Sequence, residues 1–139
     1  MNYKQQEWSS AHGTLGGKRT YMRKNASLLP VDKTQFPHVV IVNLIYREVR
    51  EDGLPAADEE LSRLDATEES VADQMQAAFG ALFGLIVTSD GARDLFFFLP
   101  EPESDDAIEA VIESCEPRVG YDFSMHEDPS WEPYVELMP

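Results

Sequence analysis

Residues 38–47, HVVIVNLIYR, decide the fold of this chain. The stretch is rich in β-branched residues and is apolar at successive positions, which is typical of a strand covered on one sheet face and partly on the other. We therefore predict a central strand here and a second apolar sheet face that also needs a cover. The cover is expected from the N-terminal segment, from the tail that carries Trp131, or from a second copy in a homodimer.

Apolar residues after this strand recur at helical spacing in two segments and at strand spacing in three others. Ser89-Asp90-Gly91 favours a tight turn because glycine accepts a positive φ, so the strands on either side of it pair antiparallel. The predicted elements are, in chain order, a helix from Asp58, a strand over 81–88, a strand over 93–99, a helix from Asp105 and a strand over 118–126.

This order, βαββαβ, predicts an α+β fold, specifically a ferredoxin-like two-layer sandwich with two helices on one face of an antiparallel sheet. One additional strand is expected before it, near residues 20–23. The 139 residues suit one core. We predict a flexible polar N-terminal segment over residues 1–20 and a single α+β domain over residues 21–139, with Cys115, the only cysteine, in the core.

The net charge of −15 is unevenly distributed. Residues 1–50 hold eight Lys or Arg against three Asp or Glu, whereas residues 51–139 hold three against 23. An acidic surface repels phosphate backbones and anionic lipids, which argues against nucleic-acid and membrane binding and favours a basic protein partner. The polar start lacks a secretory signal and no apolar run could cross a bilayer, so a cytoplasmic location is expected.

No pattern for a catalytic, cofactor or metal site stands out. His12, His38 and His126 are far apart and lack zinc-ligand spacing, so no metal and no cofactor is expected. Ser124, His126 and Asp128 lie two apart, but neighbours on one strand face are about 6.5–7 Å apart, too far for the direct hydrogen bonds of a triad.

Two patterns suggest binding residues instead. Charged residues enter a strand at Arg93-Asp94, and two aromatic side chains follow Asp128-Pro129 three residues apart, as in a recognition patch or as a lid on the sheet. A pocket could also form between the second sheet face and the tail. The candidate interaction or pocket residues are Tyr46, Arg93, Asp94, His126, Asp128, Trp131 and Tyr134.

Three motifs resemble a bacterial family, the domain of unknown function family 695. They are Gly53-Leu54-Pro55, the stretch 91–98 with its three phenylalanines, and the stretch 128–134. The resemblance covers most of the chain from about Tyr21 and implies no activity. More distantly, size, charge and element order are similar to the regulator of ribonuclease activity B, which binds and inhibits an RNA-degrading endonuclease; this implies no residue roles.

Three functional hypotheses follow from the sequence. The first is a non-catalytic interaction or regulatory domain that binds a basic protein partner through its acidic surface. The second is a small-ligand-binding domain or enzyme with a pocket at the sheet face. The third is a bacterial immunity protein, whose acidic character would suit a basic toxin.

Overall fold

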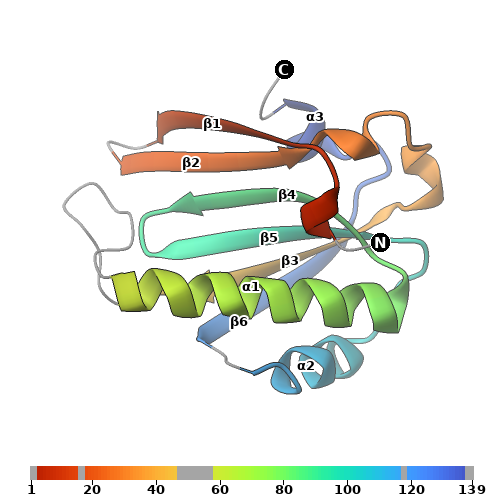
Figure 1. The fold of residues 1–139 in the computed structure, drawn as a ribbon. Helices are drawn as coiled ribbons and strands as arrows, with labels where there is room; N and C mark the ends of the chain where they lie inside the picture. Colours follow the sequence, from red (N-terminus) through yellow and green to blue (C-terminus); the bar gives the residue numbers. More distant parts are fainter. Residues whose placement is uncertain (1–2, 16–17, 47–57, 117–118, 137–139) are drawn as a thin grey trace.

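Six strands form one antiparallel sheet, with helices packed on its two faces (Figure 1). The computed structural model describes residues 3–15, 18–46, 58–116 and 119–136. Its strands are β1 (Trp8–Leu15), β2 (Lys18–Asn25), β3 (His38–Ile45), β4 (Leu82–Ser89), β5 (Ala92–Leu99) and β6 (Gly120–Glu127). Its helices are α1 (Asp58–Phe79), α2 (Asp105–Glu113) and α3 (Glu132–Glu136), with short 3-10 turns η1 (Tyr3–Gln5), η2 (Ala26–Leu28) and η3 (Lys33–Gln35).

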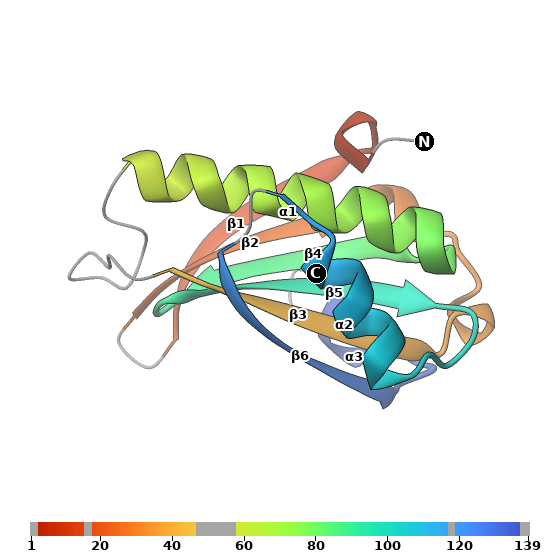
Figure 2. The same cartoon turned by 90° about the horizontal axis from the view of Figure 1, so that it is seen from below.

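The strand order across the sheet is β1-β2-β4-β5-β3-β6, and every neighbouring pair is antiparallel. From β3 to β6 the chain runs strand, helix, strand, strand, helix, strand. The predicted α+β class is therefore confirmed. Figure 2 shows α1 and α2 side by side along the sheet.

The turn between β4 and β5 has the geometry that its sequence predicts. Ser89 pairs with Ala92, so only Asp90 and Gly91 form the loop, and their φ angles are 46° and 88°. Two positive φ values in a two-residue loop match the right-handed twist of the flanking strands. The Asp-Gly pair thus sets the register of this hairpin.

The N-terminal region differs from the prediction, which placed one strand there and none before residue 20. It holds two strands, β1 and β2, paired over their full length from Trp8–Asn25 to Leu15–Lys18, so the boundary predicted at residue 20 falls inside β2. The sequence signal was weak because β1 lies at the sheet edge, where backbone hydrogen bonds to one neighbour suffice and few apolar side chains are needed.

The first core lies between the sheet and helices α1 and α2. Leu64, Val71 and Met75 of α1 are fully buried, as are Ile108 and Ile112 of α2. Helical spacing had identified these positions, but the same predicted stripe included Leu61, which is 40% exposed. Cys115, the predicted core residue, is buried. Burial of one such side chain is worth about 1.5–3 kcal/mol, so this stripe holds the helices on the sheet.

The C-terminal tail covers the second apolar face. Trp131 is fully buried and stacks on Phe98 of β5 with ring centroids 3.9 Å apart, while its Nε1 donates to the Phe36 carbonyl over 2.8 Å. The buried Tyr134 hydroxyl donates to the Asn25 carbonyl over 2.7 Å, and burial raises the pKa of Tyr134 to about 12. Leu28, Val31 and Phe36, from the segment between β2 and β3, pack in the same cluster. The tail, one of the three covers that the sequence left open, therefore covers this face together with that segment.

Replacement of Trp131 by alanine removes an aromatic side chain from a closed interior, with its stacking partner and its hydrogen bond. We expect Trp131→Ala to lower the free energy of unfolding by about 3–5 kcal/mol, measured by urea denaturation. The matched control is Val135→Ala in α3, the helix that directly follows Trp131; the Val135 side chain is 51% exposed, so little change is expected. Equal effects of the two substitutions would contradict the packing described here.

Candidate functional site

A cleft opens between α1 and the β1–β2 hairpin, above strands β4 and β5. Its volume is about 650 Å³. The lining side chains come from η1, from the hairpin, from one face of α1 and from the two central strands. They are Tyr3, Lys4, His12, Tyr21, Arg23, Leu61, Asp65, Glu68, Thr88 and Arg93.

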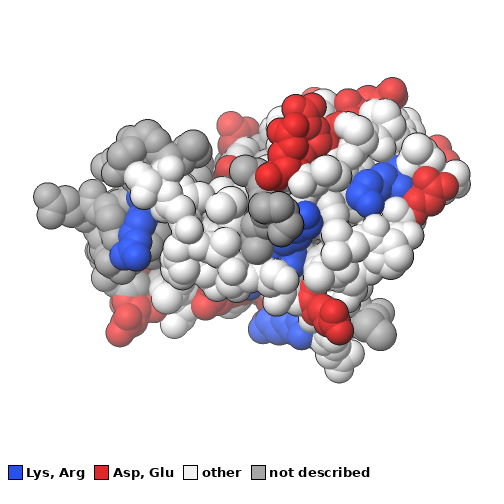
Figure 3. Space-filling view, turned by 90° about the horizontal axis from the view of Figure 1, so that it is seen from above, with Lys and Arg blue, Asp and Glu red and all other residues white. Residues whose placement is uncertain are grey.

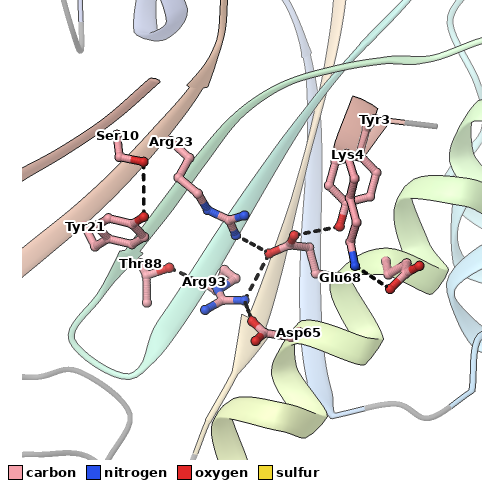
Figure 4. Close-up of polar contacts among 10 residues, drawn as sticks. Tyr3, Lys4, Ser10, Tyr21, Arg23, Asp65, Glu68, Thr88 and Arg93 are labelled. Atoms are coloured by element: carbon pink, nitrogen blue, oxygen red, sulfur yellow. Dashed lines mark hydrogen bonds and ion pairs between the residues drawn. The ribbon is translucent and has the colours of Figure 1, made fainter. Parts of the chain in front are cut away.

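Arg93 forms the floor of this cleft and is 4% exposed. Its Nε donates to the Thr88 hydroxyl over 3.1 Å. Its Nη1 donates to Asp65 Oδ1 over 2.7 Å and to Glu68 Oε1 over 3.0 Å (Figure 4). Because Asp65 is exposed and Glu68 is buried, the guanidinium joins the mouth of the cleft to its interior.

Glu68 is the centre of the polar network. Its carboxylate is buried, and Oε1 accepts from both Arg23 Nη2 and Arg93 Nη1, whereas Oε2 accepts from the Tyr3 hydroxyl over 2.8 Å. Burial, followed by the charge of Glu68, raises the pKa of Tyr3 well above its ordinary value. Tyr3 therefore remains a neutral donor, and one carboxylate joins η1, β2, β5 and α1 (Figure 4).

Arg23 is the cation of this network that is closer to solvent. Its side chain is 24% exposed. Its Nε is buried and makes no hydrogen bond within the part of the chain that the structure describes. A buried donor without an acceptor costs about 1–3 kcal/mol, so the contacts described leave this guanidinium incompletely satisfied.

The rim of the cleft combines aromatic and charged groups. The rings of His12 and Tyr21 lie 4.7 Å apart at their centroids, and the Tyr21 hydroxyl donates to Ser10. Lys4 Nζ pairs with Glu69 on α1 over 2.8 Å. The hairpin side of the rim thus presents flat rings, and η1 presents a cation.

The hydrogen bonds of this network run from cations and a phenol to carboxylates and a hydroxyl. Each cation of the network thus has a carboxylate partner, and the Tyr3 hydroxyl donates to the same carboxylate as both guanidinium groups. Among the described residues, no group of three His, Cys, Asp or Glu side chains is placed to hold a metal ion.

The residues that the sequence proposed as a site lie in separate places. Arg93 faces the cleft, whereas Asp94 lies on the opposite sheet face, where it accepts from Asn43 over 2.7 Å and where burial raises the pKa of its carboxyl. Tyr46 is buried in the first core. Trp131 is fully buried in the second.

His126 and Asp128 lie elsewhere, beside α3, where they line a shallow hollow with Glu132. Asp128 also accepts from the backbone N–H of Glu132 over 2.9 Å, which fixes the start of the helix. The expected pocket between the second sheet face and the tail would need Trp131 and Arg93 on the same side of the sheet. They lie on opposite sides.

Sequence reasoning missed most of the residues that form the cleft. One signal was present: Glu68 occurs four residues after Leu64 and three before Val71, so it lies on the buried stripe of α1. A carboxylate on an apolar stripe requires a buried cation. The partners on β2 and η1 were hidden because the β1–β2 hairpin was not predicted.

Replacement of Glu68 by glutamine keeps the shape of the side chain but leaves two guanidinium groups without their shared charge. We expect Glu68→Gln to lower the free energy of unfolding by about 3–5 kcal/mol, measured by urea denaturation. The control is Glu69→Gln, the next residue, whose pair with Lys4 is exposed and for which a change below about 1 kcal/mol is expected. Similar losses in the two variants would show that the Glu68 network is not the stabilising feature.

Among the described residues, no helix is both long and apolar enough to cross a membrane.

Comparisons with known proteins give a family but no activity. None of the curated proteins searched matches the chain. The sequence model of a family of unknown function, DUF695, matches residues 6–138, a range that includes β1, and the chain therefore belongs to this family.

Proposed function

We propose that this chain is a non-catalytic binding domain whose ligand occupies the cleft between α1 and the β1–β2 hairpin. The observation that carries the proposal is the charged floor of the cleft, where Arg23 and Arg93 share the buried carboxylate of Glu68. A volume of about 650 Å³ falls in the range of small-molecule sites.

The free-energy cost of burying the charged side chains at the floor of the cleft supports the proposal. Charges removed from water lose several kcal/mol of hydration, and well-packed apolar residues of similar volume often stabilise a fold equally well or better. A network of two arginines, a glutamate and a tyrosine therefore attaches η1 and the hairpin to α1 with less gain in folding free energy than apolar packing could provide. Recognition of a ligand gives the network a purpose that packing alone does not.

The charges around the cleft indicate an anionic ligand. Three cations, Lys4, Arg23 and Arg93, line it. They pair with three carboxylates, Asp65, Glu68 and Glu69, an even balance in a chain where Asp and Glu outnumber Lys and Arg by 26 to 11. Guanidinium groups bind carboxylate and phosphate in a planar fork. With the rings of His12 and Tyr21 at the rim, the site suits a flat molecule that bears a carboxylate or phosphate group.

The experiment is a two-dimensional NMR titration with pairs of aromatic fragments, each carboxylate matched by its neutral amide. We expect carboxylates to bind at least about tenfold more tightly than amides, which corresponds to about 1.4 kcal/mol. Shifts should concentrate on Tyr21, Thr88 and Arg93. Lys4→Gln and His12→Ala should each weaken binding, whereas Thr14→Ala, an exposed change on the same strand outside the cleft, should not.

The titration can also reject the proposal. Shifts confined to the hollow near Asp128 would place binding elsewhere, and equal affinity for acids and amides would remove the argument from charge. Because the variants are made at exposed positions, their unfolding midpoints are expected to match that of the unchanged chain, which separates loss of binding from loss of fold.

A second candidate function is binding of a basic protein partner on the outer surface of α1 and α2. Helix α1 contains seven Asp or Glu, of which all but the buried Glu68 remain for this surface, and one Arg; α2 contains four Asp or Glu and no Lys or Arg. Such a surface would attract a basic partner and speed its association. The resemblance in size and charge to a ribonuclease regulator, and the idea of an immunity protein for a basic toxin, are both compatible with this surface.

Charge reversal tests the second candidate. The protein is used as bait for partners in native lysate at low and moderate salt, and a stoichiometric basic partner should be released by the added salt. A variant with three lysine substitutions on the helices should bind this partner at least about tenfold more weakly. A control variant with the same net charge should bind it as the unchanged chain does. The helix set is Asp73, Asp106 and Glu109, and the control set is Glu7, Asp122 and Glu127. Retention by the helix variant would contradict the proposal.

The strand order also supports a structural classification that we propose here. The sequence β6-β3-β5-β4 across the sheet, together with the chain order βαββαβ, is consistent with a ferredoxin-like sandwich extended by the β1–β2 hairpin. The hairpin then acts as the addition that builds one wall of the cleft.

A further inference from the structure

Strand β1 forms one edge of the sheet. It pairs with β2 over eight consecutive residues without a register shift, and β2 is its only neighbour in the sheet that the structure describes (Figure 1). An edge strand presents a row of backbone N–H and C=O groups that can pair with another strand. Proteins ordinarily protect such edges with charged side chains, proline or bulges.

None of these protections occurs in β1. Its sequence, WSSAHGTL, contains no Asp, Glu, Lys, Arg or Pro. The opposite edge strand, β6, differs: it contains Asp122, His126 and Glu127, and all three side chains are exposed. The β6 edge therefore carries charged side chains that oppose pairing with another strand, whereas the β1 edge carries none.

The distribution of charge favours contact at the same edge. Two copies of a chain with net charge −15 repel each other wherever their carboxylates meet. Neither β1 nor β2 contains a carboxylate, whereas the acidic α2 and β6 lie at the other side of the sheet (Figures 1 and 2). Seen from above the hairpin, Lys and Arg side chains form separate patches among uncharged surface, with Asp and Glu also present (Figure 3).

We propose that two copies of this chain pair antiparallel through β1 and form one continuous twelve-stranded sheet, six strands from each copy. Antiparallel pairing of two identical edges is isologous, so the same interaction is made twice and the assembly closes as a dimer. The pairing places no like charges opposite each other in β1, and it keeps the acidic edges at the two far ends of the sheet.

The dimer also bears on the cleft. His12 of β1 lines the cleft, and the two-fold axis of such a pair is perpendicular to the sheet, so both α1 helices lie on the same face. Each cleft would then open beside the first strand of the partner. The inference does not depend on the proposed ligand, because backbone pairing at β1 requires nothing to be bound.

The test is the molar mass of the full chain in solution, measured by light scattering across about a hundredfold range of concentration. We expect the mass to rise from 15.7 kDa toward twice that value. Ala11→Lys places a charge beside its copy in the centre of the pair and should weaken the dimer at least about tenfold. Ser124→Lys, the same charge on edge strand β6, should leave it unchanged.

Each outcome decides the matter. A wild-type chain that stays monomeric at the highest concentration overturns the proposal, as does a dimer that survives Ala11→Lys or is lost with Ser124→Lys. Hydrogen exchange gives an independent readout, because amide protons of β1 should gain protection in the concentrated sample and lose it on dilution. Unfolding midpoints of both lysine variants show whether the monomer fold is intact.

Discussion

The buried carboxylate of Glu68 is the interaction on which the arrangement of this domain depends. It accepts hydrogen bonds from η1, β2 and β5 while its backbone belongs to α1, so four parts of the chain meet at one charge. A charge in the interior is tolerated only when its partners stay in place, which fixes the hairpin and the N-terminal turn relative to the helix. The cleft exists because this link holds the hairpin beside α1 without closing the space between them.

The sheet separates two regions with different physical character. On one face, α1 and α2 cover an apolar core whose border with the hairpin is polar and open. On the other face, the tail seals an aromatic cluster in which Phe98 lies against Trp131 and Tyr134. The region beside the hairpin is polar and open to solvent, whereas the aromatic region under the tail is closed.

Most of the fold followed from local patterns, and most of the site did not. The apolar run at 38–45, the helical spacing after Asp58 and the Asp-Gly turn depend on neighbouring residues, so the sequence revealed them. The cleft depends on contacts such as that between Tyr3 and Glu68, which are 65 residues apart and leave no periodic trace. The aromatic residues of the tail were recognised, but their burial depended on a partner strand that only the tertiary structure shows.

The seal on the second face also determines when the domain can finish folding. Trp131 and Tyr134 bond to backbone carbonyls 95 and 109 residues earlier in the chain. Contacts of such long sequence separation form late, because the intervening chain must lose its freedom first. During synthesis, the aromatic face of the sheet therefore lacks these two side chains until residues 131–134 are free to pack on it.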